Sequence, residues 1–283
     1  IYFFIKIAII FFLNEIFKNW KKSELDLNYK DKPYVVKNYA KNWTASKKWT
    51  FNYIKNIKGS DLKVNTVRGN AALGEGKITS ISFKKYISQI ISHKNKTYLT
   101  TFYLFKKFPK LIKDINYDYI KSNSLFCHVL SWIGPKNSIT GFHCDWSENI
   151  NVQVRGEKVF YVVSPEFNKY MYISDKFERI SSTSDVDLKK IKSNKFPLFK
   201  KAQVIRVHLK KGDLIYIPRG WWHYVRSLKP SIAVSFHFWN FKNFFRDLLY
   251  ESAKVLLHDI GLFKRNKCAC HSFDKNGNRH KRG

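Results

Sequence analysis

Cysteine is scarce in this chain and does not form a disulfide framework. The 283 residues include four cysteines: Cys127, Cys144, Cys268 and Cys270. A disulfide-stapled secreted scaffold needs regularly paired cysteines, so we expect a reduced intracellular protein, cytoplasmic or nuclear. The segment 268–271 (CACH), with His280 downstream, lacks a second convincing ligand pair, and we expect no zinc there.

Acidic residues are also few. There are 21 Asp and Glu against 52 Lys and Arg, which gives a formal net charge of +31. A balance this basic favours anionic partners such as nucleic acid or a membrane surface. The basic residues are scattered, however, and Lys, Asn, Ile, Phe and Tyr are all abundant, as expected from an A/T-rich coding sequence. We therefore favour a compositional origin of the charge and keep a nucleic-acid face as the alternative.

No apolar run is long enough to cross a membrane. The opening stretch IYFFIKIAIIFFLNEIF is interrupted by Lys6 and closed by Asn14 and Glu15, short of the roughly 20 residues that a spanning helix requires. For residues 1–31 we expect a packing helix and hold a membrane anchor as the alternative. The first residue is not Met, and an upstream segment would change this prediction.

A phosphate-binding loop is missing as well. Gly69 and Gly74 stand at the spacing of that motif, but Glu75 occupies the position of its lysine. Ile78 follows Lys77, where a Ser or Thr would bind magnesium. We interpret residues 68–77 as an ordinary loop.

What is present is ample core material, with 44% hydrophobic and 17% aromatic residues. Between residues 32 and 118 the patterns are mixed: 33–36 and 62–67 predict short strands, and 82–91 has apolar residues at helical spacing. This part is predicted to be an α/β flank.

From about residue 124 to 240 the pattern becomes that of a β protein. Short β-branched and aromatic runs alternate with turn signals. They predict eight strands, near 127–133, 138–144, 149–155, 157–163, 202–209, 212–217, 223–228 and 231–239. Such a set favours an antiparallel barrel or a sandwich of two sheets. Residues 241–262 have helical periodicity, and we expect this helix to pack outside the barrel or to form a dimer contact, before a basic tail at 263–283.

Three residues within the predicted barrel suggest a metal site. His143 and Asp145 are two apart on one strand, so both side chains point to the same face. With His223 they would form the two-His, one-carboxylate set of non-haem Fe(II) oxygenases. The pattern His-x-Asp alone is a weak signal. Lys158 strengthens it, because a lysine inside a barrel is costly unless it meets an anion, such as a dicarboxylate co-substrate.

The same residues stand in a longer pattern that resembles a JmjC (cupin-like) domain. Its parts are SWIG at 131–134, TGFHCD at 140–145, NINVQVRGEK at 149–158, GDLIYIPRGWWH at 212–223 and FHFW at 236–239. The likeness covers roughly residues 32–240. It is similar to the small JmjC-only protein hydroxylases, among them the asparaginyl hydroxylase of hypoxia-inducible factor and relatives of the heat-shock-protein-associated JmjC protein. The resemblance implies a mainly β protein with a double-stranded β-helix (jelly-roll, cupin) core.

The resemblance also implies roles for individual residues. His143, Asp145 and His223 would bind Fe(II), and Lys158 and Thr140 would hold the distal carboxylate of 2-oxoglutarate. Tyr98 would reach the same carboxylate, and Asn149 would lie near the co-substrate. His237 departs from the pattern, because the asparaginyl hydroxylase has an asparagine there; a hydrogen-bonding role near the metal is one interpretation. Trp221 and Trp222 would either flank the substrate entrance or pack the barrel.

The activity implied is that of a 2-oxoglutarate-dependent dioxygenase that hydroxylates a protein side chain and releases succinate and CO2. A lysine demethylase would use the same site. A tRNA hydroxylase is a third possibility because of the net charge, and an inactive cupin-like binding protein is a fourth. We expect a protein or peptide substrate, with a homodimer as a further possibility.

Overall fold

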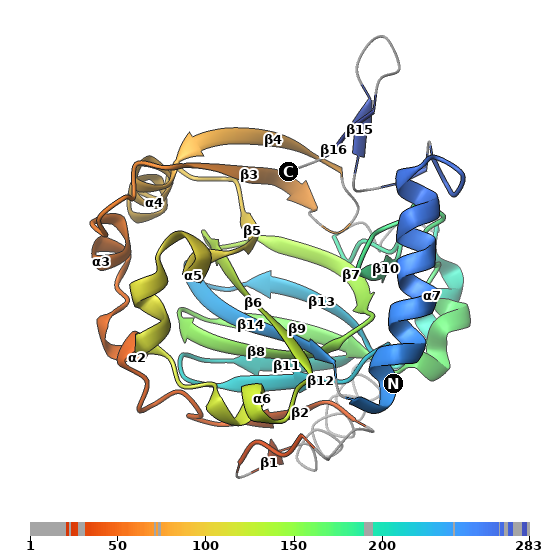
Figure 1. Ribbon diagram of the computed structural model, residues 1–283, viewed down its shortest axis with the longest axis horizontal. Coiled ribbons are helices and arrows are strands. Elements are labelled where there is room, and N and C mark those ends of the chain that lie inside the picture. Colours follow the sequence, from red (N-terminus) through yellow and green to blue (C-terminus); the bar gives the residue numbers. More distant parts are fainter. Residues whose placement is uncertain are drawn as a thin grey trace, which may run out of the picture.

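The computed structural model describes residues 21–22, 24–27, 32–70, 72, 75–189, 195–239, 241–265, 267–268, 271–273 and 279–281. Two β-sheets face each other and form the body of the molecule (Figure 1). The predicted jelly-roll, a cupin-like double-stranded β-helix, is therefore confirmed.

The larger sheet has seven strands in the order β1-β2-β12-β8-β14-β6-β5. Apart from the parallel pair β1 and β2, neighbouring strands in it are antiparallel. The strand bounds are β1 Lys21–Lys22, β2 Tyr34–Val36, β5 Leu99–Phe102, β6 Phe126–Gly134, β8 Glu148–Arg155, β12 Leu214–Ile217 and β14 Ser231–Trp239.

The smaller sheet has five antiparallel strands in the order β10-β7-β13-β9-β11. Their bounds are β7 Ile139–Asp145, β9 Lys158–Val163, β10 Ser181–Thr183, β11 Ile205–Leu209 and β13 Trp222–Ser227. The chain alternates between the two sheets from β6 to β9, which is why strands far apart in the sequence become neighbours. All eight strands predicted between residues 124 and 240 are present.

Helices cover the outer face of the larger sheet. They are α2 Thr44–Lys48, α3 Phe51–Lys55, α4 Phe83–Ile91, α5 Leu104–Lys107 and α6 Asp118–Ser122, with the short 3-10 turn η1 Pro109–Asp114. The turns η2 Pro165–Tyr170 and η3 Pro197–Lys201 pack on the smaller sheet instead, where Phe199 contacts Phe142 of β7. On β14, Phe236 packs outward against Trp43 and Tyr117. Because side chains alternate along a strand, the next residue, His237, points inward between the sheets. The helical cover therefore fixes which face of β14 lines the interior.

The predicted helix near 82–91 is confirmed as α4. Ser82 caps it, since its hydroxyl accepts a hydrogen bond from the Lys85 backbone N–H at 3.2 Å. The interpretation of residues 68–77 as a loop was wrong. Strands β3 Lys63–Asn70 and β4 Glu75–Ser82 form a hairpin that includes both ends of this stretch, and backbone pairing with the opposite strand outweighs the low strand propensity of its glycines.

The C-terminal helix is confirmed as α7 Phe241–Asp259, which stands beside the barrel on the side away from α2 and α3 (Figure 1). A hairpin of β15 His271–Phe273 and β16 Arg279–Lys281 follows. Among the described residues, no helix is both long and apolar enough to span a membrane. The apolar run at residues 1–17 and Cys270 of the rejected zinc motif lie outside the described residues.

Candidate active site

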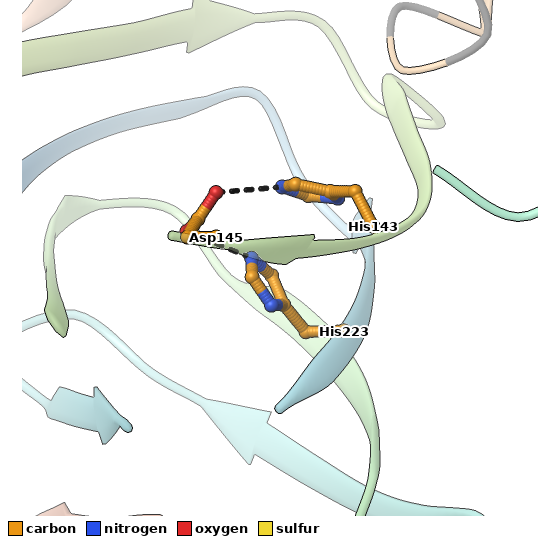
Figure 2. A group of neighbouring side chains, drawn as sticks. All are labelled: His143, Asp145 and His223. Carbon is orange, nitrogen blue, oxygen red and sulfur yellow. Dashed lines mark ion pairs between the residues drawn. The ribbon is translucent and has the colours of Figure 1, made fainter. Parts of the chain in front are cut away.

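Strand pairing brings two histidines to the same point of the smaller sheet. Strands β7 and β13 are antiparallel neighbours, and His223 lies directly opposite His143. The centroids of the two imidazole rings are 4.1 Å apart. Asp145 is two residues beyond His143 on β7, so it projects from the same face, and Figure 2 shows both rings turned toward its carboxylate.

The distances within this group suit a single metal ion. His143 Nε2 lies 3.8 Å from Asp145 Oδ1, and His223 Nε2 lies 3.5 Å from Asp145 Oδ2. The ligand atoms of all three residues are within 4.8 Å of one another. Two ligands that each bind one ion at about 2.1 Å can be at most about 4.2 Å apart, so each imidazole nitrogen can share an ion with the carboxylate. The donor set is the one that non-haem Fe(II) sites use.

Backbone carbonyls fix the tautomer of both histidines. His143 Nδ1 is 2.8 Å from the Gly141 carbonyl oxygen, and His223 Nδ1 is 3.1 Å from that of Trp221. A carbonyl can only accept, so each Nδ1 carries the proton and each Nε2 keeps its lone pair toward Asp145. Burial lowers the pKa of His223 to about 3, so this ring is neutral and can act as a ligand.

The Asp145 carboxylate is buried but held in its charged form. Burial alone would raise its pKa, but His237, His223 and His143 and a hydrogen bond from Asn149 together lower it. Asn149 Nδ2 donates to Asp145 Oδ2 at 2.8 Å. His237 Nδ1 is 3.7 Å from the same oxygen. Asn149 and His237 therefore orient the carboxylate from the larger sheet.

A second group of polar side chains surrounds Lys158. This lysine is 1% exposed, and its Nζ donates a hydrogen bond to Tyr98 Oη at 3.1 Å. Tyr98 also hydrogen-bonds with Thr140. Burial lowers the pKa of Lys158 to about 7. Within the described part of the chain, no carboxylate lies in ion-pair distance of it, so the ammonium is available to an anion.

One cavity of about 180 Å³ joins the two groups. All eight site residues predicted from the sequence line it: Tyr98, Thr140, His143, Asp145, Asn149, Lys158, His223 and His237. The histidine and aspartate group lies toward one end of β7, and Thr140 lies toward the other. A molecule bound here can thus contact a metal and a buried cation together.

The family comparison agrees with this geometry. The family model described as "Cupin-like domain" matches residues 22–244. The chain belongs to the cupin-like JmjC family. It is 30% identical over 228 residues to "JmjC domain-containing protein D" of Dictyostelium discoideum, covering 72% of this chain and 51% of that protein.

Two other relatives are named for what they act on or associate with. The JmjC chain is 30% identical to "Lysine-specific demethylase JMJ30" of Arabidopsis thaliana over 72% of its own length and 49% of the relative's. It is 34% identical to human "HSPB1-associated protein 1" over 38% of its length and 22% of the relative's. The chain spans about half the length of the first two curated relatives.

Sequence reasoning missed several residues of this JmjC site. Asn151 lines the cavity from β8, and Trp132 lines it from β6. Asn151 was within reach of the sequence, because it is two residues from Asn149 and shares its face. Among the described residues, the buried Oδ1 of Asn151 and Nε2 of His237 have no hydrogen-bond partner, so both can serve a ligand. Trp221 and Trp222 do not line the cavity. Both are buried and pack within the protein.

The hairpin β3-β4 supports the site through Asn70. Asn70 Oδ1 accepts a hydrogen bond from the Gly141 backbone N–H at 2.7 Å. A Cβ at Gly141 would lie 2.2 Å from Asn70 Nδ2, closer than any real contact. Because residue 141 is glycine, Asn70 of the β3-β4 hairpin can bond to the β7 backbone at a position two residues before His143. This role was not visible in the sequence, since it depends on contact between segments 71 residues apart.

Proposed function

We propose that this chain is an Fe(II)- and 2-oxoglutarate-dependent dioxygenase that hydroxylates a side chain of a protein target. His143, Asp145 and His223 would hold the iron. Lys158, Tyr98 and Thr140 would hold the distal carboxylate of 2-oxoglutarate. When bound, the iron supplies the oxidising chemistry, in which one atom of O2 enters succinate and the other enters a C–H bond of the target, with release of CO2.

The observation that carries this proposal is the buried Lys158 beside a possible metal site in one cavity. An unpaired ammonium in the interior is costly, and a carboxylate partner offsets that cost. A molecule that bears a carboxylate at one end and metal-binding oxygens at the other satisfies both groups at once. 2-Oxoglutarate has this form.

The protein's own residues would organise the reaction. Gly141 and Trp221 carbonyls hold the two imidazoles in the tautomer that binds a metal. Asn149 fixes the Asp145 carboxylate by donating a hydrogen bond to Oδ2. The surrounding apolar walls, such as Phe160 and Val225, exclude water from the reacting atoms.

A lysine demethylase is the second candidate, because three relatives that each match 72% of this chain carry that name. The same site would hydroxylate an N-methyl group, and the resulting hemiaminal would release formaldehyde. Formaldehyde from methyl-lysine peptides, measured together with succinate, separates demethylation from stable hydroxylation. We favour hydroxylation because the sequence pattern resembles that of the small JmjC-only protein hydroxylases. We do not propose a tRNA substrate, for which the net charge is the sole support.

The test is 2-oxoglutarate binding in the presence of Mn(II), which replaces iron without supporting turnover. Wild-type protein should bind 2-oxoglutarate only with the metal, and His143→Ala/Asp145→Ala should lose that binding. His208→Ala is the matched control, since His208 on β11 is not among the residues lining the cavity. Metal-independent binding, or no binding by folded wild type, would move the chain to the inactive cupin-like class.

A further inference from the structure

One wall of the cavity is formed by a segment that leads into strand β10. Residues 175–181, here called the rim segment, contribute Glu178, Ile180 and Ser181 to the lining. Ser181 begins β10 and lies directly opposite Asp145 of β7. The rim segment therefore lines the cavity beside the metal-binding group.

The rim segment faces away from the Lys158 end of the cavity. On β9, Val162 lies opposite His223, whereas Lys158 lies opposite Ser227, four residues further along. At about 3.3 Å per residue this is roughly 13 Å. A co-substrate held between Lys158 and the metal would leave the side under the rim segment for the target. This placement of the target rests on the proposed function.

Hydrogen bonds to neighbouring parts of the chain hold both ends of the rim segment. Ser174 N–H donates to the Thr183 carbonyl at 2.8 Å, and Asp185 N–H donates to the Tyr172 carbonyl at 3.0 Å. Between these anchors, the Trp146 N–H donates to the Ile180 carbonyl at 3.1 Å. The C-terminal segment makes further contacts with the rim segment.

Phe177 is the centre of those contacts. It is 5% exposed, and its ring lies 4.3 Å from that of His258 and 5.6 Å from that of Phe263. Its backbone N–H donates to the Lys267 carbonyl at 2.8 Å. On the other side its ring is 6.3 Å from Trp146, the residue after Asp145. Phe177 thus connects the C-terminal segment with the strand that carries the metal ligands.

Charged groups repeat the connection on both sides of Phe177. Arg179 forms a two-pronged ion pair with Asp259, one arm of which is 3.0 Å long. Lys264 Nζ donates to the Asp175 carbonyl at 2.7 Å, and Lys267 Nζ lies 2.8 Å from the Asp175 carboxylate. The second of these is exposed and contributes little. Residues 254–265 and 267–268, here called the C-terminal clasp, therefore contact the rim segment at three points.

We propose that the C-terminal clasp positions the rim segment over the target side of the active site, with Phe177 and Arg179 as positioning residues. Release of the clasp would leave Lys158 and the metal ligands in place, because these belong to the barrel strands. It would open the target side of the metal to water and loosen target recognition. In the intact protein, the end of α7 would therefore support part of the active-site wall.

The test uses charge exchange in the full chain. The variants are Arg179→Asp, Asp259→Arg and the double variant, with Lys48→Glu as a control that disrupts an ion pair with Asp114 far from the cavity lining. Hydrogen exchange of residues 175–181 reports the position of the segment. Water-proton relaxation by bound Mn(II), with 2-oxoglutarate present, reports water access to the metal. The 2-oxoglutarate Kd with Mn(II) reports the other end of the cavity.

In each single variant, the backbone amides of residues 175–181 should exchange hydrogen roughly three- to tenfold faster than in wild type. The water-proton relaxation rate caused by bound Mn(II) should rise, while the 2-oxoglutarate Kd stays within about twofold of the wild-type value. The double variant should restore both signals, and Lys48→Glu should change neither. Unchanged hydrogen exchange in the single variants would overturn the proposal. A loss of 2-oxoglutarate affinity as large as the change in exchange rate would also overturn it. Wild type that fails to bind 2-oxoglutarate with Mn(II) would refute the proposed function, while the exchange data would still decide whether the clasp holds the rim.

Discussion

Replacing Lys158 with methionine should stabilise the protein and abolish co-substrate binding. The lysine is almost fully buried, and its ammonium donates a hydrogen bond to Tyr98 Oη. Methionine has an unbranched side chain that can fill the path of the lysine stem without bringing a charge into the interior. The substitution therefore isolates the free-energy cost of the buried ammonium.

The size of the effect follows from the pKa of Lys158, which burial lowers from 10.5 to about 7. At about 1.4 kcal/mol per pKa unit, the buried charge costs roughly 5 kcal/mol below pH 7. Losing the hydrogen bond to Tyr98 offsets about 1 kcal/mol of the gain. Near pH 6.5, the free energy of unfolding of Lys158→Met should thus be roughly 3 to 4 kcal/mol higher than that of wild type.

The direction of the pH dependence is fixed by the lowered pKa. Between pH 7 and 10.5 the unfolded chain binds more protons at Lys158 than the folded chain does, so wild-type stability rises with pH. The advantage of the methionine variant should therefore shrink to below about 1 kcal/mol near pH 9.5.

Urea unfolding at the two pH values measures this difference, provided that the slopes with denaturant stay equal. Lys136→Met, at an exposed lysine, is the control and should change stability by less than about 0.5 kcal/mol. In parallel, the 2-oxoglutarate Kd with Mn(II) should rise at least about 100-fold, because the carboxylate loses its buried partner. A methionine variant that is less stable near pH 6.5, or whose advantage is the same at both pH values, would refute this reasoning.

Three further substitutions test the support of the site. Asn149→Leu removes the hydrogen bond to Asp145 and should weaken Mn(II) binding about 10- to 100-fold; a titration with unchanged affinity would contradict the positioning role. Gly141→Ala should lower the free energy of unfolding by about 1–3 kcal/mol, because its Cβ would clash with Asn70; Asn70→Ala in the same chain should recover part of that loss in urea unfolding. His237→Leu removes the imidazole whose Nδ1 lies 3.7 Å from Asp145 Oδ2 and should weaken Mn(II) binding about 10-fold; an unchanged affinity in the same titration would contradict a role of His237 in orienting that carboxylate.

The barrel could be predicted from the sequence because its signals are local. Strands such as 149–155 and 231–239 are predicted by their β-branched and aromatic residues between turn signals. The spacing His143-x-Asp145 also places both side chains on one face without any knowledge of the fold. The approach of His223 to this pair depends on the register between β7 and β13, and the family resemblance supplied that expectation.

The parts that sequence reasoning missed depend on contacts between distant segments. The three-residue strand β10 exists because β7 offers it a partner, and a run this short has no periodicity to detect. Residues 68–77 contain glycines typical of loops, yet pairing across the hairpin holds both ends as strands. The contact of Phe177 with His258 likewise joins residues 81 positions apart, and neither residue type predicts the other.

The polar groups of the cavity explain why its two ends belong to one site. Lys158, Asn151 and His237 come from β9, β8 and β14. Asn151 and His237 bury polar atoms that have no hydrogen-bond partner among the described residues, and the buried Lys158 ammonium has a hydrogen bond to Tyr98 Oη but no carboxylate beside it there. A barrel selected for stability alone would place apolar side chains at these positions. A ligand that pairs with them converts each cost into binding free energy and stabilises the fold by mass action. Metal and 2-oxoglutarate together should therefore raise the Tm of wild type far more than that of Lys158→Met, which has no buried ammonium for the ligand to neutralise.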